Sequence, residues 1–199
     1  MNQLASPVEP AWKRFLTPWK IAAVLVGVFL ITEGYLAWRD RAIEAALANA
    51  PAFASPPLAL EFSRKIQYDP LSFVGRGAHA GLWNWTPEGL ELTAEGSKYF
   101  RMDGDRIVSE SPAGSRRLTR IQSRSPQGDS QQIVFFYEWV EISPPAEALL
   151  RPAPKKGEQY LARVVLGRQD AGWVMTALEA RDFDEPLQRL QDAASGVQR

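Results

Sequence analysis

The stretch that decides the fold is IVFFYEWVEI, residues 133–142, whose apolar run is interrupted only by Glu138 and Glu141. Aromatic and β-branched residues favour strands, and side chains of a strand alternate between its two faces. One face would carry Ile133, Phe135, Tyr137 and Trp139, and the other Val134, Phe136 and Val140. Because both faces are apolar, the pattern predicts a central strand that is buried on both sides.

Turn signals divide the surrounding chain into short paired strands. Thr-Pro-Glu-Gly at residues 86–89 suits a type I turn, and Asp-Gly-Asp at residues 103–105 is a hairpin signal. The predicted strand pairs are 82–85 with 90–93, 99–102 with 106–109, and 160–168 with 173–180. A predominantly antiparallel sheet is therefore expected.

A short C-terminal helix is predicted from Asp184, which would be its N-cap, with Pro186 in the first turn and Gly196 after the end. Asp182, Asp184 and Glu185 are interpreted as negative charge at the start of this helix, in preference to a cation site. Together the elements predict an α+β fold.

Residues 21–32 form an uncharged apolar run, and the apolar character extends over the 20 residues 19–38, about 30 Å of helix. Trp12, Trp19, Tyr35 and Trp38 lie at its ends, where interfacial aromatic residues are expected. The expected organisation is a cytoplasmic segment over 1–18, a transmembrane helix over 19–38, a helix extension and linker over 39–57, and a soluble β-rich domain over 58–199.

The apolar helix is expected to remain as an anchor, because Pro51 directly follows the small-x-small motif that ends at Ala50. Three basic residues precede the apolar run and two follow it, which favours a cytoplasmic N-terminus. In a bacterium the domain would then be periplasmic and the anchor would lie in the inner membrane. Glu33 would reach the lipid headgroups, or else contact a partner subunit within the membrane.

Composition excludes several kinds of chemistry. The chain has no Cys and a single His, His79, so it has no thiolate metal site, cysteine nucleophile or three-His metal centre. Beyond residue 38 there are 20 basic and 21 acidic residues, which gives no electrostatic reason to expect nucleic acid as a partner. No cofactor is expected. A catalytic role for His79 would need partners supplied by the fold, and the alternative is a solvent-facing loop histidine.

Arginines and tryptophans are the candidate contact residues. On a regular strand Arg116, Arg120 and Arg124 share a face, where they could bind phosphate or carboxylate groups of lipid, cell-wall polymer or an acidic partner. The alternative, which we favour, is a charged edge strand that discourages aggregation. Trp83 and Trp85 are predicted on one face of a short strand, as exposed contacts. The glycine-rich segment 75–81 lacks the helix that a dinucleotide site needs, and is interpreted as a flexible surface loop.

The pattern Leu92-Thr93-x-x-Gly96-x-x-Tyr99-Phe100, an aromatic strand over 135–139 and a strand leading into Gly172-Trp173 resembles a loose group of uncharacterised bacterial exported proteins. The resemblance covers about residues 80–175, and the chain departs from it at 111–117, where such proteins often carry a Cys and an aromatic residue. It implies export and a β-rich domain, with no known activity. The Leu-Thr-x-x-Gly motif also resembles the wing hairpin of winged-helix regulators.

Three functional hypotheses follow from these patterns. The first is a non-catalytic, membrane-anchored envelope module whose partners are the lipid bilayer and another envelope protein, as a subunit or accessory of a larger membrane complex. The second is a membrane-tethered regulator with a winged-helix-like domain. The third is a periplasmic enzyme or small-ligand binder that uses His79 and the Arg116–Arg124 row, for which both groups would have to line one pocket.

Overall fold

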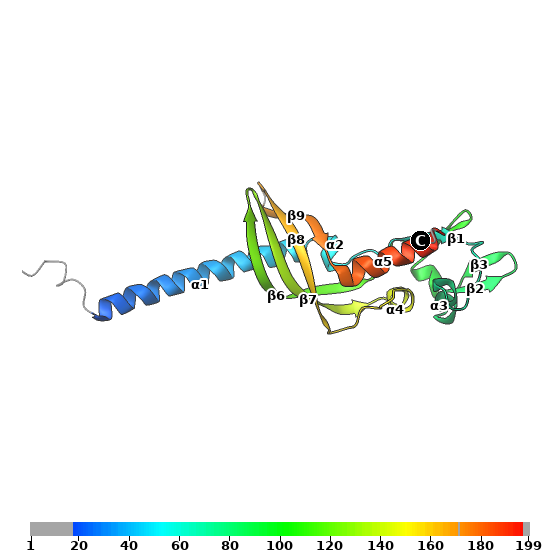
Figure 1. Cartoon of the computed structure of the whole chain (residues 1–199), viewed down its shortest axis with the longest axis horizontal. Helices are drawn as coiled ribbons and strands as arrows, with labels where there is room; N and C mark the ends of the chain where they lie inside the picture. Colours follow the sequence, from blue (N-terminus) through cyan, green and yellow to red (C-terminus); the bar gives the residue numbers. More distant parts are fainter. Residues whose placement is uncertain (1–17, 171, 197–199) are drawn as a thin grey trace, which may run out of the picture. The chain divides into compact units, whose positions relative to one another are not determined.

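The computed structural model describes residues 18–170 and 172–196 (Figure 1). The chain divides between Ala42 and Ile43 into two compact units. Residues 1–17, and with them most of the predicted cytoplasmic segment and Trp12, lie outside the described residues.

Helix α1 (Pro18–Ala48) contains both the predicted apolar helix over 19–38 and its predicted extension. The described apolar side chains from Val24 to Ile31 are exposed. The side chains of Glu33, Tyr35 and Trp38 lie outside the described part of the chain. Among the described residues, no helix combines the length and the apolar content that crossing a membrane requires.

The second unit begins within α1, because Ile43 and Leu47 are buried in its core. The stretch 50–57, expected to be part of a linker, instead contains helix α2 (Pro51–Ala54). Phe53 of α2 is only 1% exposed, and its ring meets that of Phe135 edge-on at 5.3 Å. The folded unit therefore starts earlier in the chain than residue 58, because a single buried aromatic side chain fixes this Ala- and Pro-rich stretch to the sheet.

Four antiparallel strands lie side by side in the order β6 (Gly114–Gln127), β7 (Ser130–Ile142), β8 (Gln159–Gln169) and β9 (Gly172–Glu179) (Figure 1). The interior position of β7 and the pairing of β8 with β9 agree with the sequence. The prediction that β7 is buried on both faces was wrong. Its inner face, with Tyr137 and Trp139, is buried, whereas its outer face, with Val134 and Phe136, is only half-buried, because the core elements cover one side alone.

Two smaller sheets complete the strands. One is three-stranded in the order β1 (Leu60–Ser63), β5 (Arg106–Ser109), β4 (Arg101–Asp103), and the other pairs β2 (Trp83–Thr86) with β3 (Gly89–Leu92). Both predicted hairpins are confirmed. The turn between β4 and β5 uses Gly104 at a φ of 57°, a left-handed conformation that glycine adopts without strain.

Helix α5 (Arg181–Ala194) leads from the four-stranded sheet towards β1, β2 and β3 (Figure 1). It begins three residues before the predicted start, and its N-cap is Ala180, not Asp184. The reason is that the carboxylate of Asp184 reaches back and accepts a hydrogen bond of 2.7 Å from the Ala180 N–H, so the helix can start a turn earlier. An α+β fold with antiparallel sheets and a C-terminal helix is confirmed.

Candidate functional site

The edge strand β6 does not alternate regularly between its two faces. Its pairing with β7 shifts between Leu118 and Arg120 and again between Ile121 and Ser123, so Thr119 and Gln122 are extra residues of two β-bulges. After each extra residue, the next side chain lies on the face opposite to the one that regular alternation would give it. Nothing in the local sequence marks these two positions, since neither is Gly or Pro.

As a result, the three arginines that were predicted to share a face do not. Arg116 and Arg124 lie on the inner face of the sheet, and Arg120, which lies between the two bulges, is on the outer face. Arg116 is paired with Trp139 and Arg124 with Ile133, whereas Arg120 is paired with Phe136. The prediction that these three arginines form one row on a single face is therefore wrong.

Arg116 is a buried cation at the junction of β6, β7 and α5. It is 6% exposed, and its guanidinium carbon lies 4.3 Å from the ring centroid of Trp139 and 4.7 Å from that of Phe183. Its Nε and Nη2 atoms have no hydrogen-bond partner among the described residues. Burial lowers the pKa of Arg116, because the charged form is poorly solvated there. The aromatic faces supply part of the missing solvation.

Asp182 of α5 is the acidic neighbour of this cation. It accepts a hydrogen bond from the hydroxyl of Tyr137 and another, 3.3 Å long, from Nε1 of Trp139. Burial raises the pKa of Asp182, while the two hydrogen bonds and the charge of Arg116 oppose that rise. Burial likewise raises the pKa of Tyr137 far above its ordinary value, so its hydroxyl stays a donor. The cluster holds the start of α5 against the sheet, which is a structural role.

The outer face of the four-stranded sheet carries several apolar side chains. Leu161 is 51% exposed and is the cross-strand partner of Phe136, whose ring centroid lies 4.9 Å from the Arg120 guanidinium carbon. Val174 is 40% exposed and pairs with Gly167, nearer the opposite end of these strands. Val134 and Val165 belong to the same face and are half-buried. Two ion pairs lie among these side chains: Arg117–Glu138 next to Phe136, and Arg163–Glu179 across β8 and β9, with Arg163 between Leu161 and Val165 on this face.

Trp83 and Trp85 separate into one core residue and one surface residue. Trp83 is 0% exposed, and its Nε1 donates a hydrogen bond of 2.8 Å to the carbonyl oxygen of Val74. Trp85 is 52% exposed near the tip of the β2–β3 hairpin, where its ring centroid lies 5.9 Å from that of Tyr68. Trp83 is therefore corrected to a packing residue, and Trp85 alone remains available for contacts.

The glycine-rich segment is a helix, α3 (Phe73–His79), and not a flexible loop. Gly75 and Gly77 are buried there. Only glycine fits at these two positions, because a Cβ atom would lie 2.3 Å from the Pro70 carbonyl oxygen at Gly75 and 1.9 Å from the ring of Trp83 at Gly77. His79 is the last residue of α3 and is exposed, as predicted. In Figure 1 α3 lies at the opposite end of the folded unit from β6, which carries Arg120, so the two candidate groups do not meet.

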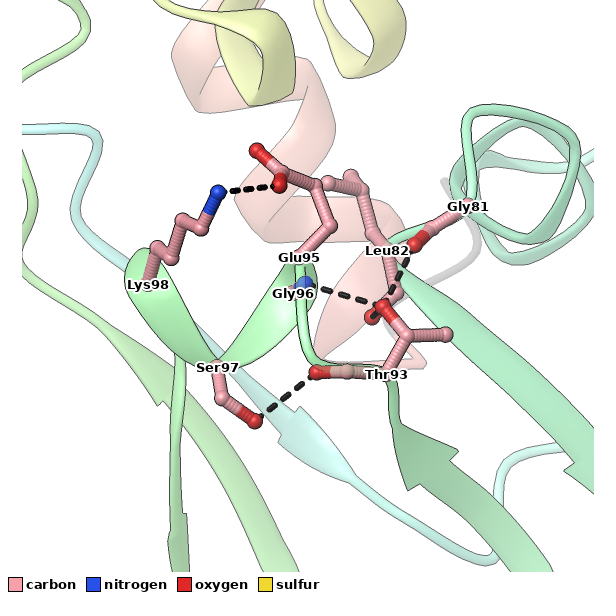
Figure 2. Close-up of polar contacts among 7 residues, drawn as sticks. All are labelled: Gly81, Leu82, Thr93, Glu95, Gly96, Ser97 and Lys98. Atoms are coloured by element: carbon pink, nitrogen blue, oxygen red, sulfur yellow. Dashed lines mark hydrogen bonds and ion pairs between the residues drawn. The ribbon is translucent and has the colours of Figure 1, made fainter.

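The Leu-Thr-x-x-Gly motif forms a tight turn whose contacts are structural (Figure 2). The hydroxyl of Thr93 donates to the Gly81 carbonyl oxygen at 2.5 Å and accepts from the Gly96 N–H at 2.9 Å. Gly96 opens the short 3₁₀ helix η2 (Gly96–Lys98), and a Cβ there would lie 1.7 Å from the Leu82 carbonyl oxygen. The motif therefore connects the end of β3 by hydrogen bonds to the short segment between α3 and β2, and only a glycine fits its last position.

A cavity that the sequence did not reveal lies between α3, the end of α4 (Pro144–Leu149) and α5. It has a volume of about 310 Å³, and three arginines line it: Arg76, Arg151 and Arg189. These residues come from three separate segments, so no spacing in the sequence could have brought them together. Elsewhere in the described part of the chain, no cluster of three or more His, Asp or Glu residues could hold a metal ion.

Comparisons of the chain with protein-family models, with curated proteins and with solved structures gave no match.

Proposed function

We propose that this chain is a membrane-anchored, non-catalytic module of the bacterial envelope that contacts a partner protein through the outer face of its four-stranded sheet. Helix α1 would be the inner-membrane anchor, with the N-terminus in the cytoplasm and the folded unit in the periplasm. The partner would be another protein of the same membrane complex.

The anchor is supported by the distribution of apolar side chains on α1. From residue 24 to residue 31 every side chain except that of Gly27 is large, apolar and exposed. Consecutive positions point in all directions around a helix, so this part of α1 is apolar on all its sides. A helix of that kind is stable in lipid or in a protein interior, and it is unfavourable in water.

The outer face carries the proposal of a protein partner. An antiparallel sheet that faces water usually presents polar side chains on that side. Here that side instead carries five apolar side chains, with ion pairs among them: Val134, Phe136, Leu161, Val165 and Val174. Apolar side chains that are exposed together with charged neighbours are typical of protein-binding surfaces. The buried Arg116–Asp182 cluster, by contrast, is enclosed by aromatic rings and offers no reacting group to a substrate.

The interface can be tested with two leucines that are both exposed. Leu161→Glu places a charge beside Phe136 on the outer face, whereas Leu71→Glu changes a leucine that is 86% exposed and lies next to α3. Each tagged variant is purified from membranes in mild detergent and the co-purifying proteins are compared by mass spectrometry. We expect Leu161→Glu to lose one partner that the unchanged chain and Leu71→Glu retain. Identical partners for all three proteins would refute the outer face as an interface.

Location is tested by fusing a reporter to the C-terminus of the full chain. A reporter that is active only in the periplasm should be active, and one that is active only in the cytoplasm should be silent. Carbonate washing should leave the chain in the membrane fraction. Cytoplasmic reporter activity would reverse the orientation, and release by carbonate would refute the anchor.

A further inference from the structure

The cavity between α3, α4 and α5 combines positive charge with an apolar wall. Its apolar lining comes from Phe73 and Val74 of α3, Leu149 of α4, and Pro186 and Leu190 of α5. Arg76 is half-buried, while Arg151 and Arg189 are exposed at its edge. Within the described part of the chain, the lining contains no aspartate or glutamate.

Backbone carbonyl groups hold the three guanidinium groups in place without neutralising them. Arg76 donates from Nη2 to the Leu149 carbonyl oxygen at 3.0 Å, and Arg189 donates from Nη2 to the Arg151 carbonyl oxygen at 3.3 Å. Arg151 donates from Nη1 to the Leu150 carbonyl oxygen at 2.6 Å. Each arginine keeps further N–H groups beyond these bonds, because a guanidinium group has five.

The charges of this cluster are poorly compensated. The only carboxylate paired with it in the described structure belongs to Glu185, whose Oε2 lies 4.0 Å from Nη1 of Arg189. Arg76 has a buried Nε atom that has no hydrogen-bond partner among the residues that the structure describes. Burial lowers the pKa of Arg76, and the positive charge of Arg151 lowers it further. Like charges that lie close together and are partly desolvated are stabilised by a bound anion.

We propose that this cavity is a binding site for a small amphipathic anion, a phosphate or carboxylate group that bears a short apolar chain. The anionic group would lie among the three guanidinium groups, where planar donors match its oxygens. The apolar chain would pack against Phe73, Leu149 and Leu190. A volume of about 310 Å³ is at the lower end of ligand-binding cavities and admits only a small molecule or the end of a longer one. The site is separate from the outer face and goes beyond the proposed contact with a partner protein.

The test uses the purified full chain in an uncharged detergent and hexyl phosphate as the probe. Isothermal titration is run with hexyl phosphate, inorganic phosphate and hexanol, at low and at high salt. We expect hexyl phosphate to bind at least about tenfold more tightly than either fragment, and its affinity to fall as the salt concentration rises. Equal affinity for inorganic phosphate would refute the apolar part of the site, and no binding of hexyl phosphate would refute the site.

Variants then place the binding in this cavity. Arg76→Gln and Arg151→Gln should each weaken hexyl phosphate about tenfold or more. Ala193→Trp keeps all three arginines and fills the cavity with a large side chain from an exposed position on α5, so it should abolish binding. This variant tests the site even if an arginine variant fails to fold. Arg181→Gln is the matched control, because Arg181 lies on the same helix and pairs with Glu179 outside the cavity. Unchanged binding by Ala193→Trp would overturn the proposal.

Competition distinguishes the two sources of such an anion. Dihexanoyl phosphatidylglycerol displaces hexyl phosphate if the natural ligand is a lipid headgroup region. Failure of this lipid to compete, with hexyl phosphate still bound, identifies a free amphipathic phosphate. Both results support an amphipathic anion site. Leu161→Glu should bind hexyl phosphate normally, so a failed interface and a failed cavity are told apart.

Discussion

The guanidinium carbon of Arg116 lies 4.3 Å from the ring centroid of Trp139, on the buried side of the sheet. A residue from the most basic stretch of the chain is thus a core residue. It bridges β6 and β7 to Phe183 of α5, and the carboxylate of Asp182 provides the nearby negative charge. The stability of the junction between the sheet and α5 should therefore depend on this single cation.

Arg116→Ala is expected to lower the free energy of unfolding by about 3 kcal/mol, because it leaves Asp182 partly buried without its cation and opens a space between aromatic rings. Urea unfolding of the full chain in detergent, followed by tryptophan fluorescence, measures this change. Arg117→Ala removes the neighbouring, exposed arginine that pairs with Glu138, and should change the free energy by less than about 1 kcal/mol. Equal losses in the two variants would contradict the role given to Arg116.

The carboxyl group of Asp182 should make the folded unit less stable as the pH rises. Its pKa in the folded state is raised from the ordinary 3.8, chiefly by burial, so the folded state binds its proton more tightly than the unfolded state does. This contribution is fully present below pH 3.8 and is lost as the pH rises through the higher pKa of the folded state. Asp182→Asn removes the titration and keeps an oxygen that can accept from Tyr137.

The measurement is the difference in unfolding free energy between Asp182→Asn and the unchanged chain at several pH values from 3 to 7. The difference should move in favour of the variant as the pH rises. A trend in the opposite direction for Asp182→Asn would mean that Arg116 and the two hydrogen bonds outweigh burial.

Gly77→Ala should destabilise the fold although alanine favours helices. The new Cβ would lie 1.9 Å from Cζ2 of Trp83, a buried and hydrogen-bonded side chain that cannot easily move. Overpacking of this kind costs about 2 kcal/mol, which corresponds to a fall of roughly 4–8 °C in Tm. Differential scanning calorimetry tests it. His79→Ala, at the exposed end of the same helix, should leave Tm nearly unchanged.

The elements that the sequence predicted are those with local causes. The β2–β3 and β4–β5 hairpins depend on turn residues such as Gly104, and these act within a few positions of the chain. The sequence of β7 likewise predicted an interior strand, although its alternation could not show that core elements cover only one of its faces. The covering elements, among them Phe53, come from a stretch whose Ala and Pro content is typical of a linker.

The features that could not be predicted depend on contacts that the local sequence pattern does not reveal. Gly75 and Gly77 read as a loop because glycine is a poor helix former, yet they are required by contacts with Pro70 and Trp83. The cavity needs Arg76, Arg151 and Arg189 from three segments, and each looks like an ordinary surface arginine in its own surroundings. The prediction that Arg116, Arg120 and Arg124 share a face was wrong for another reason: the two bulges interrupt the regular alternation of side chains along β6.

Those two bulges have a consequence for the kinds of mutation that β6 tolerates. Between Thr119 and Gln122 the strand is read in a shifted phase, and only this shift sends Arg120 to the outer face while Arg116 and Arg124 go to the inner one. Deletion of Thr119 or of Gln122, the two extra residues, would leave every other residue of β6 opposite its present partner on β7 and on its present face, whereas deletion of a paired residue such as Leu118 would shift the register on one side of it. The two bulge positions are therefore the places in this strand where the loss of a residue disturbs the sheet least.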